Sequence, residues 1–397
     1  MKTAIRALAL AAALIGSGVG IAWSVRLAIA DYWFRKETPQ ATQKAIDWTP
    51  GRADYHVRLA LLVGEDHPSE AIEALRQAVT LNPHSSRPWI ELGLRYEAEN
   101  RFAEAEKALL RAAEIDKQYE PRWSLMNYYF RRDQTEPFWE WATAAVPMIY
   151  GDPSPLFHLC GRVSEDGQLI DRLQIHKVEL QAAYLFYLVD MGRADLAGAA
   201  SRRLLESDRA GDVPLLLDAC DRLIDGHRVD DAAAIWNGLA ARDRVRRTPI
   251  SDFSTSPTGH GFDWRLPIVE GVSAAREEKP SGLRLTFSGS EPEQAEVLTQ
   301  YEPVLGDTAY DFSFRYRTRQ IDAGTGLAWR ILDAATGRVI HDGQDLAADE
   351  PVTKQVSFRT PPECRMIRLA LSYQRRPGTV RIAGYIVLQQ AGIKPEP

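Results

Sequence analysis

Cysteine is scarce in this chain of 397 residues, and the three cysteines present, Cys160, Cys220 and Cys364, lie far apart. Three cysteines at such distances form neither a disulfide framework nor the close spacing of a metal site. We therefore expect each of them to be a small buried apolar residue. Lysine is rare as well, with nine lysines against 39 arginines throughout the chain.

An excess of positive charge is also lacking. The formal net charge is -6 at pH 7, which argues against general nucleic-acid binding, because such binding needs a basic surface. Hydrophobic residues make up 45% of the chain and charged residues 26%, which is ordinary for globular protein and excludes gross disorder. The length suffices for two or three domains.

Motifs typical of catalysis are missing too. The sequence has no glycine-rich phosphate loop after a strand, no His-Glu-x-x-His helix and no Gly-x-Ser-x-Gly turn. The eight histidines show no paired helical spacing, so we predict neither a metal nor a cofactor. We predict a protein that is not an enzyme. A hydrolase whose carboxylates are distant in sequence remains an alternative.

One long apolar segment stands at the N-terminus. The 19 residues from Ala7 to Val25 carry no charge and lie between Arg6 and Arg26. About 20 apolar residues cross a bilayer as a helix. We expect residues 7–25 to be an uncleaved membrane anchor, with a signal cleaved after Ala28-Ile29-Ala30, or a buried soluble helix, as alternatives. Basic residues flank both ends, so the short N-terminal arm decides the expected orientation: bacterial inner membrane, single-pass, with the body in the periplasm.

The first half of the chain repeats every 34 residues. Tyr55, Trp89 and Trp123 follow this period, and so do Ala71 and Ala105. Two helices with their turns use about 34 residues, and such a unit cannot bury its apolar face alone. The period therefore predicts a stack of helical hairpins over residues 50–247, with a groove for a protein partner.

The clearest copy covers residues 86–119 and resembles the tetratricopeptide repeat. Small residues at the helix crossing allow close approach, and aromatic residues fill the space around it. The expected packing residues are Trp89, Leu92, Gly93, Tyr96, Ala105, Leu109 and Ala112. Arg95 and Asn127 are expected to face the groove. Two looser copies begin at Met191 and Asp225.

The copy after Trp123 departs from the pattern and is rich in aromatic residues. These residues either fill a core between mismatched helices or form a peptide-binding patch. They are Trp123, Tyr128, Tyr129, Phe130, Phe138, Trp139 and Trp141.

From about residue 248, apolar and polar residues alternate. Runs of period two, separated by Gly, Pro and Asp, predict an antiparallel jelly-roll-like β-sandwich over residues 248–392. The expected strands contain Leu283 to Phe287, Tyr310 to Tyr316, Leu327 to Ile331, Val356 to Phe358, Ile367 to Leu371, Val380 to Ile382, and Tyr385 to Leu388.

This second half resembles galactose-binding-like and carbohydrate-binding-module sandwiches of bacterial tetratricopeptide proteins encoded with exopolysaccharide systems. The resemblance is carried by Gly261 to Trp264, Leu285 to Gly289, Tyr310 to Arg317, Gly326 to Ile331, Phe358 to Cys364, and Gly384-Tyr385. It implies that the sandwich binds carbohydrate in polysaccharide assembly or export.

Arginines alternate with the apolar positions of the expected strands. On one sheet they would form a cationic surface for carboxylate or phosphate groups; alternatively, they form a solvated face paired with Asp and Glu. These residues are Arg315, Arg317, Arg330, Arg359 and Arg381. Trp264 either stacks on a sugar ring or plugs the core, whereas Trp329 belongs to the core.

The expected organisation is therefore multidomain. It comprises an anchor or signal at 1–30, a linker at 31–49, the all-α array at 50–247, the all-β sandwich at 248–392 and a tail at 393–397. We expect a non-enzymatic, membrane-anchored scaffold whose repeats bind a protein and whose sandwich binds polysaccharide. A protein–protein adaptor without sugar binding and a polysaccharide-modifying hydrolase are the alternatives.

Overall fold

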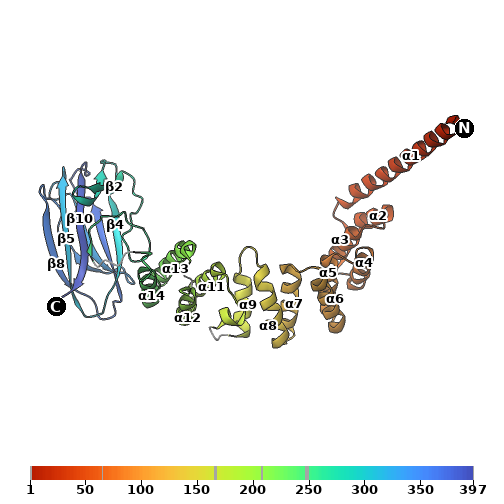
Figure 1. Cartoon of the computed structure of the whole chain (residues 1–397), viewed down its shortest axis with the longest axis horizontal. Helices are drawn as coiled ribbons and strands as arrows, with labels where there is room; N and C mark the ends of the chain where they lie inside the picture. Colours follow the sequence, from red (N-terminus) through yellow and green to blue (C-terminus); the bar gives the residue numbers. More distant parts are fainter. Residues whose placement is uncertain (1, 65, 165–167, 207–208, 246–249, 397) are drawn as a thin grey trace. The chain divides into compact units, whose positions relative to one another are not determined.

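The computed structural model describes residues 2–64, 66–164, 168–206, 209–245 and 250–396. The chain divides into two compact units, Met1–Gln174 and Ile175–Pro397. An apolar N-terminal helix, an array of helical hairpins and an antiparallel β-sandwich follow one another along the sequence (Figure 1), which confirms the predicted fold class.

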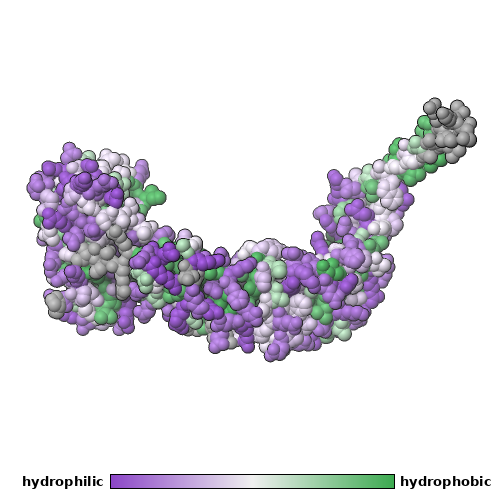
Figure 2. All heavy atoms as spheres, in the orientation of Figure 1, coloured by the Kyte–Doolittle hydropathy of each residue, from purple (hydrophilic) through white to green (hydrophobic). Residues whose placement is uncertain are grey.

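The N-terminal helix, α1, runs over Lys2–Phe34 and includes the Ala28-Ile29-Ala30 triplet. Its segment Ala13–Phe34 is long and apolar enough to cross a membrane, and only 6% of the most apolar window is buried by the rest of the protein. Figure 2 shows apolar residues exposed along this helix. A membrane anchor and a signal sequence both have these properties.

The segment expected to be a linker contains a helix, α2, over Pro39–Trp48. Thr38 caps it by accepting a hydrogen bond from the backbone N–H of Ala41 at 3.2 Å, and Pro39 occupies the first turn, where no N–H is needed. Ala41, Ala45 and Ile46 are buried. The array is thus preceded by a packed helix.

Three helical hairpins make up the repeats of the first unit, and each repeat consists of two antiparallel helices. They are α3 (Ala53–Val63) with α4 (Pro68–Leu81), α5 (Ser86–Ala98) with α6 (Phe102–Ile115), and α7 (Tyr119–Arg131) with α8 (Thr135–Ala145). Two further helices, α9 (Ser154–Val163) and α10 (Leu169–Arg172), follow a short 3-10 turn, η1 (Val146–Met148). The third hairpin forms although its sequence departs from the pattern.

The aromatic residues of the third hairpin divide into two groups. Tyr128, Tyr129, Phe138 and Trp139 are buried between α7, α8 and their neighbours. The other three are half-buried: Trp123, Phe130 and Trp141. Core filling therefore accounts for the larger group.

The second unit begins with two more hairpins, which are the looser repeat copies. They are α11 (Val178–Asp190) with α12 (Ala194–Leu204), and, after η2 (Ala210–Asp212), α13 (Val213–Asp225) with α14 (Val229–Ala240). Gly192 and His227, which are 35 positions apart, both end the first helix of their hairpin with a positive φ, of 67° and 58°. Residues in this left-handed conformation commonly end helices.

The β-sandwich has two antiparallel sheets in its described residues. Sheet A has the order β2-β3-β10-β5-β8, with β1 also on β10, and sheet B has the order β4-β9-β6-β7. The strands are β1 (Ile250–Ser251), β2 (Val272–Glu278), β3 (Ser281–Phe287), β4 (Gln294–Pro303), β5 (Ala309–Arg319), β6 (Leu327–Asp333), β7 (Val339–Asp342), β8 (Val352–Arg359), β9 (Met366–Gln374) and β10 (Tyr385–Pro395).

The inner faces of the two sheets form one core, in which the predicted alternating residues of β3, β5, β6, β8 and β9 take part. Two boundaries differ from expectation. Val380 is exposed and lies in a loop rather than a strand, although Ile382 is buried. Strand β10 continues to Pro395, because Lys394 and Pro395 still pair with β5, so the expected tail is mostly strand. The expected start of the sandwich at residue 248 lies outside the described residues.

Candidate protein-binding groove

Close packing of α5 against α6 positions the candidate site. A Cβ atom on Gly93 would lie 2.6 Å from Cγ of Leu109 and 3.2 Å from the carbonyl oxygen of Ala105. Ala105, Leu109 and Ala112 are buried on the facing side of α6. The absent side chain at Gly93 therefore lets the two helices approach, as the sequence pattern implies.

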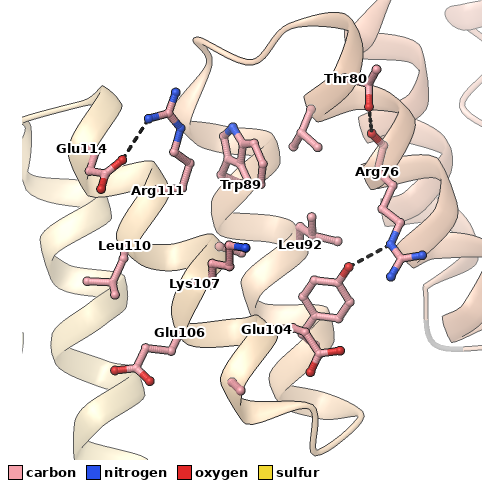
Figure 3. Close-up of a pocket in the computed structure, with 14 residues that line it drawn as sticks. Arg76, Thr80, Trp89, Leu92, Glu104, Glu106, Lys107, Leu110, Arg111 and Glu114 are labelled. Atoms are coloured by element: carbon pink, nitrogen blue, oxygen red, sulfur yellow. Dashed lines mark hydrogen bonds and ion pairs between the residues drawn. The ribbon is translucent and has the colours of Figure 1, made fainter.

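This packing leaves a groove between α4 and α6, with α5 as its floor (Figure 3). The groove has a volume of about 820 Å³. Trp89, Leu92 and Tyr96 come from α5 at helical spacing and form the floor, with Val79 of α4 and Leu110 of α6 beside them. The indole N–H of Trp89 donates to the carbonyl of Pro83 at 3.2 Å, which fixes the ring. Three of the predicted packing residues thus also line a groove.

The acidic residues of the groove wall are already engaged. Glu114 pairs with Arg111 at 2.9 Å. Glu104 pairs with Arg101 at 2.7 Å, and this arginine holds the pKa of Glu104 below its usual range. Glu106 accepts a hydrogen bond of 2.7 Å from the Tyr129 hydroxyl, and burial together with that bond raises the tyrosine pKa.

Two basic residues of the wall, Arg76 and Lys107, form no ion pair with the described residues. The Arg76 guanidinium donates to the Tyr96 hydroxyl at 2.9 Å, a neutral partner that raises the arginine pKa. Among the described residues, the Lys107 ammonium has no hydrogen-bond or ion-pair partner, and the side chain is exposed at the rim. Arg76 and Lys107 are thus the cations of the wall without an ion pair, and Glu106, whose partner is the neutral Tyr129 hydroxyl, is the corresponding carboxylate.

The two residues expected to contact a partner do not line this groove. The Arg95 guanidinium lies beside Gly64, and the Asn127 side-chain amide donates to the carbonyl of Trp123 at 2.8 Å. On the same helices, Glu97 and Arg131, which are 34 positions apart, form a two-pronged ion pair at 2.8 and 2.7 Å. The first helices of these two repeats are thus joined by an ion pair.

The expected arginine surface of the sandwich is divided between two sheets. Arg315, Arg317 and Arg359 belong to β5 and β8 of sheet A, but Arg330 belongs to β6 of sheet B, and Arg381 lies in a loop. The alternation of apolar and polar residues shows that a side chain points outward, but it does not show to which of the two sheets the strand belongs. The sequence therefore could not reveal that these arginines are divided between the sheets.

These arginines are also paired. Arg317 lies 3.0 Å from Glu277, Arg330 lies 3.0 Å from Asp342, and Arg359 lies 3.3 Å from Asp307. Arg315 donates to the side-chain amide of Gln389 at 2.9 Å. The pairing matches the alternative of a solvated face compensated by carboxylates and amides.

Trp264 is in the core and not on a sugar-binding surface. Only 1% of its surface is exposed, and it packs on Phe253 and Trp329 with ring centres 5.7 and 5.6 Å away. Since its ring has no free face, stacking on a sugar is incompatible with this packing. Trp329 is buried as predicted.

The three cysteines are buried and free, as predicted. Burial raises the pKa of Cys220 to about 12 and that of Cys364 to about 11. Such thiols stay protonated and unreactive at neutral pH. Among the described residues, no group of three His, Cys, Asp or Glu side chains could hold a metal ion.

Known proteins resemble the two halves of the chain separately. The tetratricopeptide repeat family matches residues 62–127, which include the groove. Residues 62–127 thus resemble tetratricopeptide repeats. A search of curated protein sequences finds no match.

Solved structures similar to the array include YrrB, described as a tetratricopeptide protein with an unusual peptide-binding site. It is 14% identical, with 52% of this chain and 93% of that chain covered and a TM-score of 0.25. PilF of Pseudomonas aeruginosa is 18% identical, with 56% and 93% covered and a TM-score of 0.27.

The sandwich is similar to a family 4 carbohydrate-binding module, with 13% identity, 34% and 88% covered and a TM-score of 0.27. At such low sequence identity, these similarities concern the fold and not the function.

Proposed function

We propose that this protein is a membrane-tethered interaction scaffold, whose groove between α4 and α6 binds an amphipathic, acidic segment of a partner protein. The observation that carries the proposal is the groove itself, in which an apolar floor adjoins two basic side chains, Arg76 and Lys107, that form no ion pair with the described residues. The match of residues 62–127 to tetratricopeptide repeats supports a binding role rather than catalysis.

The chemistry of the groove defines the expected segment. Trp89 and Leu92 provide apolar surface for one or two aliphatic or aromatic side chains, and aromatic residues are frequent anchors of protein interfaces. Arg76 and Lys107 would attract carboxylates of the segment, whereas Glu106 offers a single site for a basic group. An amphipathic helix laid in a groove combines both features at a spacing of three or four residues.

The membrane tether is part of the same proposal. Helix α1 has the length and composition of a membrane span, and we infer that it holds the body at the periplasmic side of a bacterial inner membrane. The arginine surface does not support a polysaccharide role, because its members are divided between sheets and paired.

Site-specific photo-crosslinking in cells tests the proposed face. A photoreactive residue replaces Leu110 in the groove in one variant and the exposed Leu94 on the other side of α5 in the control. We expect adducts from position 110 that map to one contiguous apolar and acidic segment, and a synthetic peptide of that segment should bind the purified full chain. Adducts from position 94 alone, or a peptide that does not bind, would contradict the proposal.

A further inference from the structure

A second pocket lies in the sandwich, between its two sheets, where the edge strands β7 and β8 approach each other. Its volume is about 450 Å³. Phe312 and Phe314 of β5 and Trp329 of β6 form its bottom, and His341, Gln344 and Lys354 are among the residues around its mouth. This pocket involves neither the repeats nor the arginines discussed above, apart from one ion pair at its rim.

Lys354 occupies an unusual position on β8. It lies directly opposite Phe314 of β5, at a register position shared with Val352, Val356 and Phe358, which pack on the sandwich core. Its ammonium lies 5.9 Å from the ring centre of Tyr316 and, in the part of the chain that the structure describes, has no hydrogen-bond or ion-pair partner. The Lys354 side chain is half-buried, so its charge lies partly against apolar surface with no group to compensate it.

Trp329 contributes a second uncompensated group. Only 2% of its surface is exposed, and its indole N–H has no hydrogen-bond partner in the described residues. Its ring is held edge-on against Phe312, with ring centres 5.1 Å apart. Buried polar groups are nearly always hydrogen-bonded in native proteins, so the Trp329 N–H would be stabilised by an acceptor in the pocket that it lines.

The chemistry of these groups selects the occupant. An ammonium and an indole N–H can only donate hydrogen bonds. The acidic residue at the rim, Asp342, is neutralised by Arg330 at 3.0 Å, so the pocket has a net positive charge. The occupant must therefore supply acceptor oxygens and negative charge, as a carboxylate does.

The rest of the pocket limits the body of the ligand. Phe312 and Phe314 offer apolar contact at the bottom, whereas the side-chain amide of Gln344 can bind a hydroxyl group at the mouth. We propose that this pocket binds a hydroxylated carboxylate of the size of a sugar acid, either as a free molecule or as the terminal residue of an acidic polysaccharide.

Lys354 and the polar groups of the pocket could have two simpler roles, and each role predicts a different binding result. An inward lysine on an edge strand also prevents pairing with strands of other molecules. Ordered water can satisfy the donors of a polar cavity. Neither role involves discrimination between a carboxylate and a neutral ligand of the same shape.

Calorimetric titration of the purified full chain in detergent tests the proposal. The probes are D-galacturonate and D-galactose, which differ at the carboxylate carbon, together with polygalacturonate. We expect saturable binding of galacturonate and none of galactose. Lys354→Met should weaken binding roughly ten- to hundredfold, because it removes a charge-assisted hydrogen bond. Lys394→Met, at an exposed lysine of β10 in the same sheet, should bind like the parent.

The second variant, Trp329→Phe, keeps an aromatic ring and removes the N–H, so that binding should weaken without loss of the fold. If polygalacturonate competes with galacturonate for the pocket, the ligand is the end of the polymer. If galacturonate binds and polygalacturonate does not, the ligand is the free acid. Equal binding of galactose and galacturonate would overturn the proposal, and so would the absence of saturable galacturonate binding. Undiminished affinity in a folded Lys354→Met protein that aggregates would assign the lysine to edge protection only.

Discussion

Replacement of Gly93 by alanine should destabilise the second repeat, although alanine is the better helix former. Two effects oppose each other. In a helix interior, alanine is favoured over glycine by about 0.5–1 kcal/mol. Overpacking of a close contact costs about 1–3 kcal/mol, and the new Cβ would lie 2.6 Å from Cγ and 2.8 Å from Cδ2 of Leu109.

Neither helix can easily yield at this contact. Leu109 is fully buried and the carbonyl of Ala105 is 3.2 Å from the new atom, so relief requires movement of α6 as a whole. We therefore expect the overpacking cost to exceed the propensity gain, and the net loss to be on the order of 1 kcal/mol.

Gly161 provides a matched control in the same unit. It lies within α9, and a Cβ at this position would meet no atom within 4 Å. Gly161→Ala should therefore stabilise its helix by about 0.5–1 kcal/mol. Hydrogen exchange of the amides of α5 and α6, together with thermal unfolding of the full chain, measures both effects. If Gly93→Ala stabilised the protein as Gly161→Ala does, the proposed crossing of α5 and α6 would be refuted.

Three further predictions concern other parts of the chain. Glu302 faces the sandwich core opposite Ile367, and burial raises its pKa from 4.5 to about 8. Between these two pH values the folded state holds a proton that the unfolded state releases, so the free energy of unfolding should fall as the pH rises from about 4.5 to 8. Glu302→Gln should remove this pH dependence, which denaturant unfolding measures. Asp221 of α13 accepts hydrogen bonds from Arg265, His260 and the N–H of Gly261 at 2.6, 2.6 and 2.7 Å. Asp221→Ala should therefore lower the free energy of unfolding by about 1–3 kcal/mol, whereas Asp218→Ala, at an exposed residue of the same helix, should leave it nearly unchanged. Equal free energies of unfolding for the two variants would show that these hydrogen bonds do not stabilise the fold. Salt washing should leave the protein in the membrane fraction with its first residues intact, and a mature protein that begins at Asp31 would instead establish a cleaved signal.

Sequence periodicity predicted most of the helices and strands that bury one face, but it missed α2, which lies in the expected linker. Leu283 and Leu285, for example, stand in the core at the positions that alternation implies. Strand β4 was missed because a register shift between Glu296 and Leu298 buries both Val297 and Leu298, which breaks the alternation.

Binding surfaces were less predictable than the fold. Trp89, Leu92 and Tyr96 were expected only to pack helices, because their period does not reveal that the neighbouring hairpin leaves a groove above them. Whether a charged residue such as Lys107 or Lys354 has a partner depends on side chains from other elements. A lysine among the alternating valines of β8 was the one sequence signal available for the pocket in the sandwich.

The affinity of a partner segment for groove variants tests the central claim most directly. The segment identified by crosslinking is synthesised and titrated against the full chain, against Trp89→Ala in the groove floor, and against Leu94→Ala, a similarly accessible apolar residue outside the groove on the same helix. We predict at least a tenfold loss of affinity for Trp89→Ala, since truncation of an interface anchor costs about 2 kcal/mol or more, and an unchanged affinity for Leu94→Ala. Equal affinity of the parent and Trp89→Ala, or a loss confined to Leu94→Ala, would contradict the account.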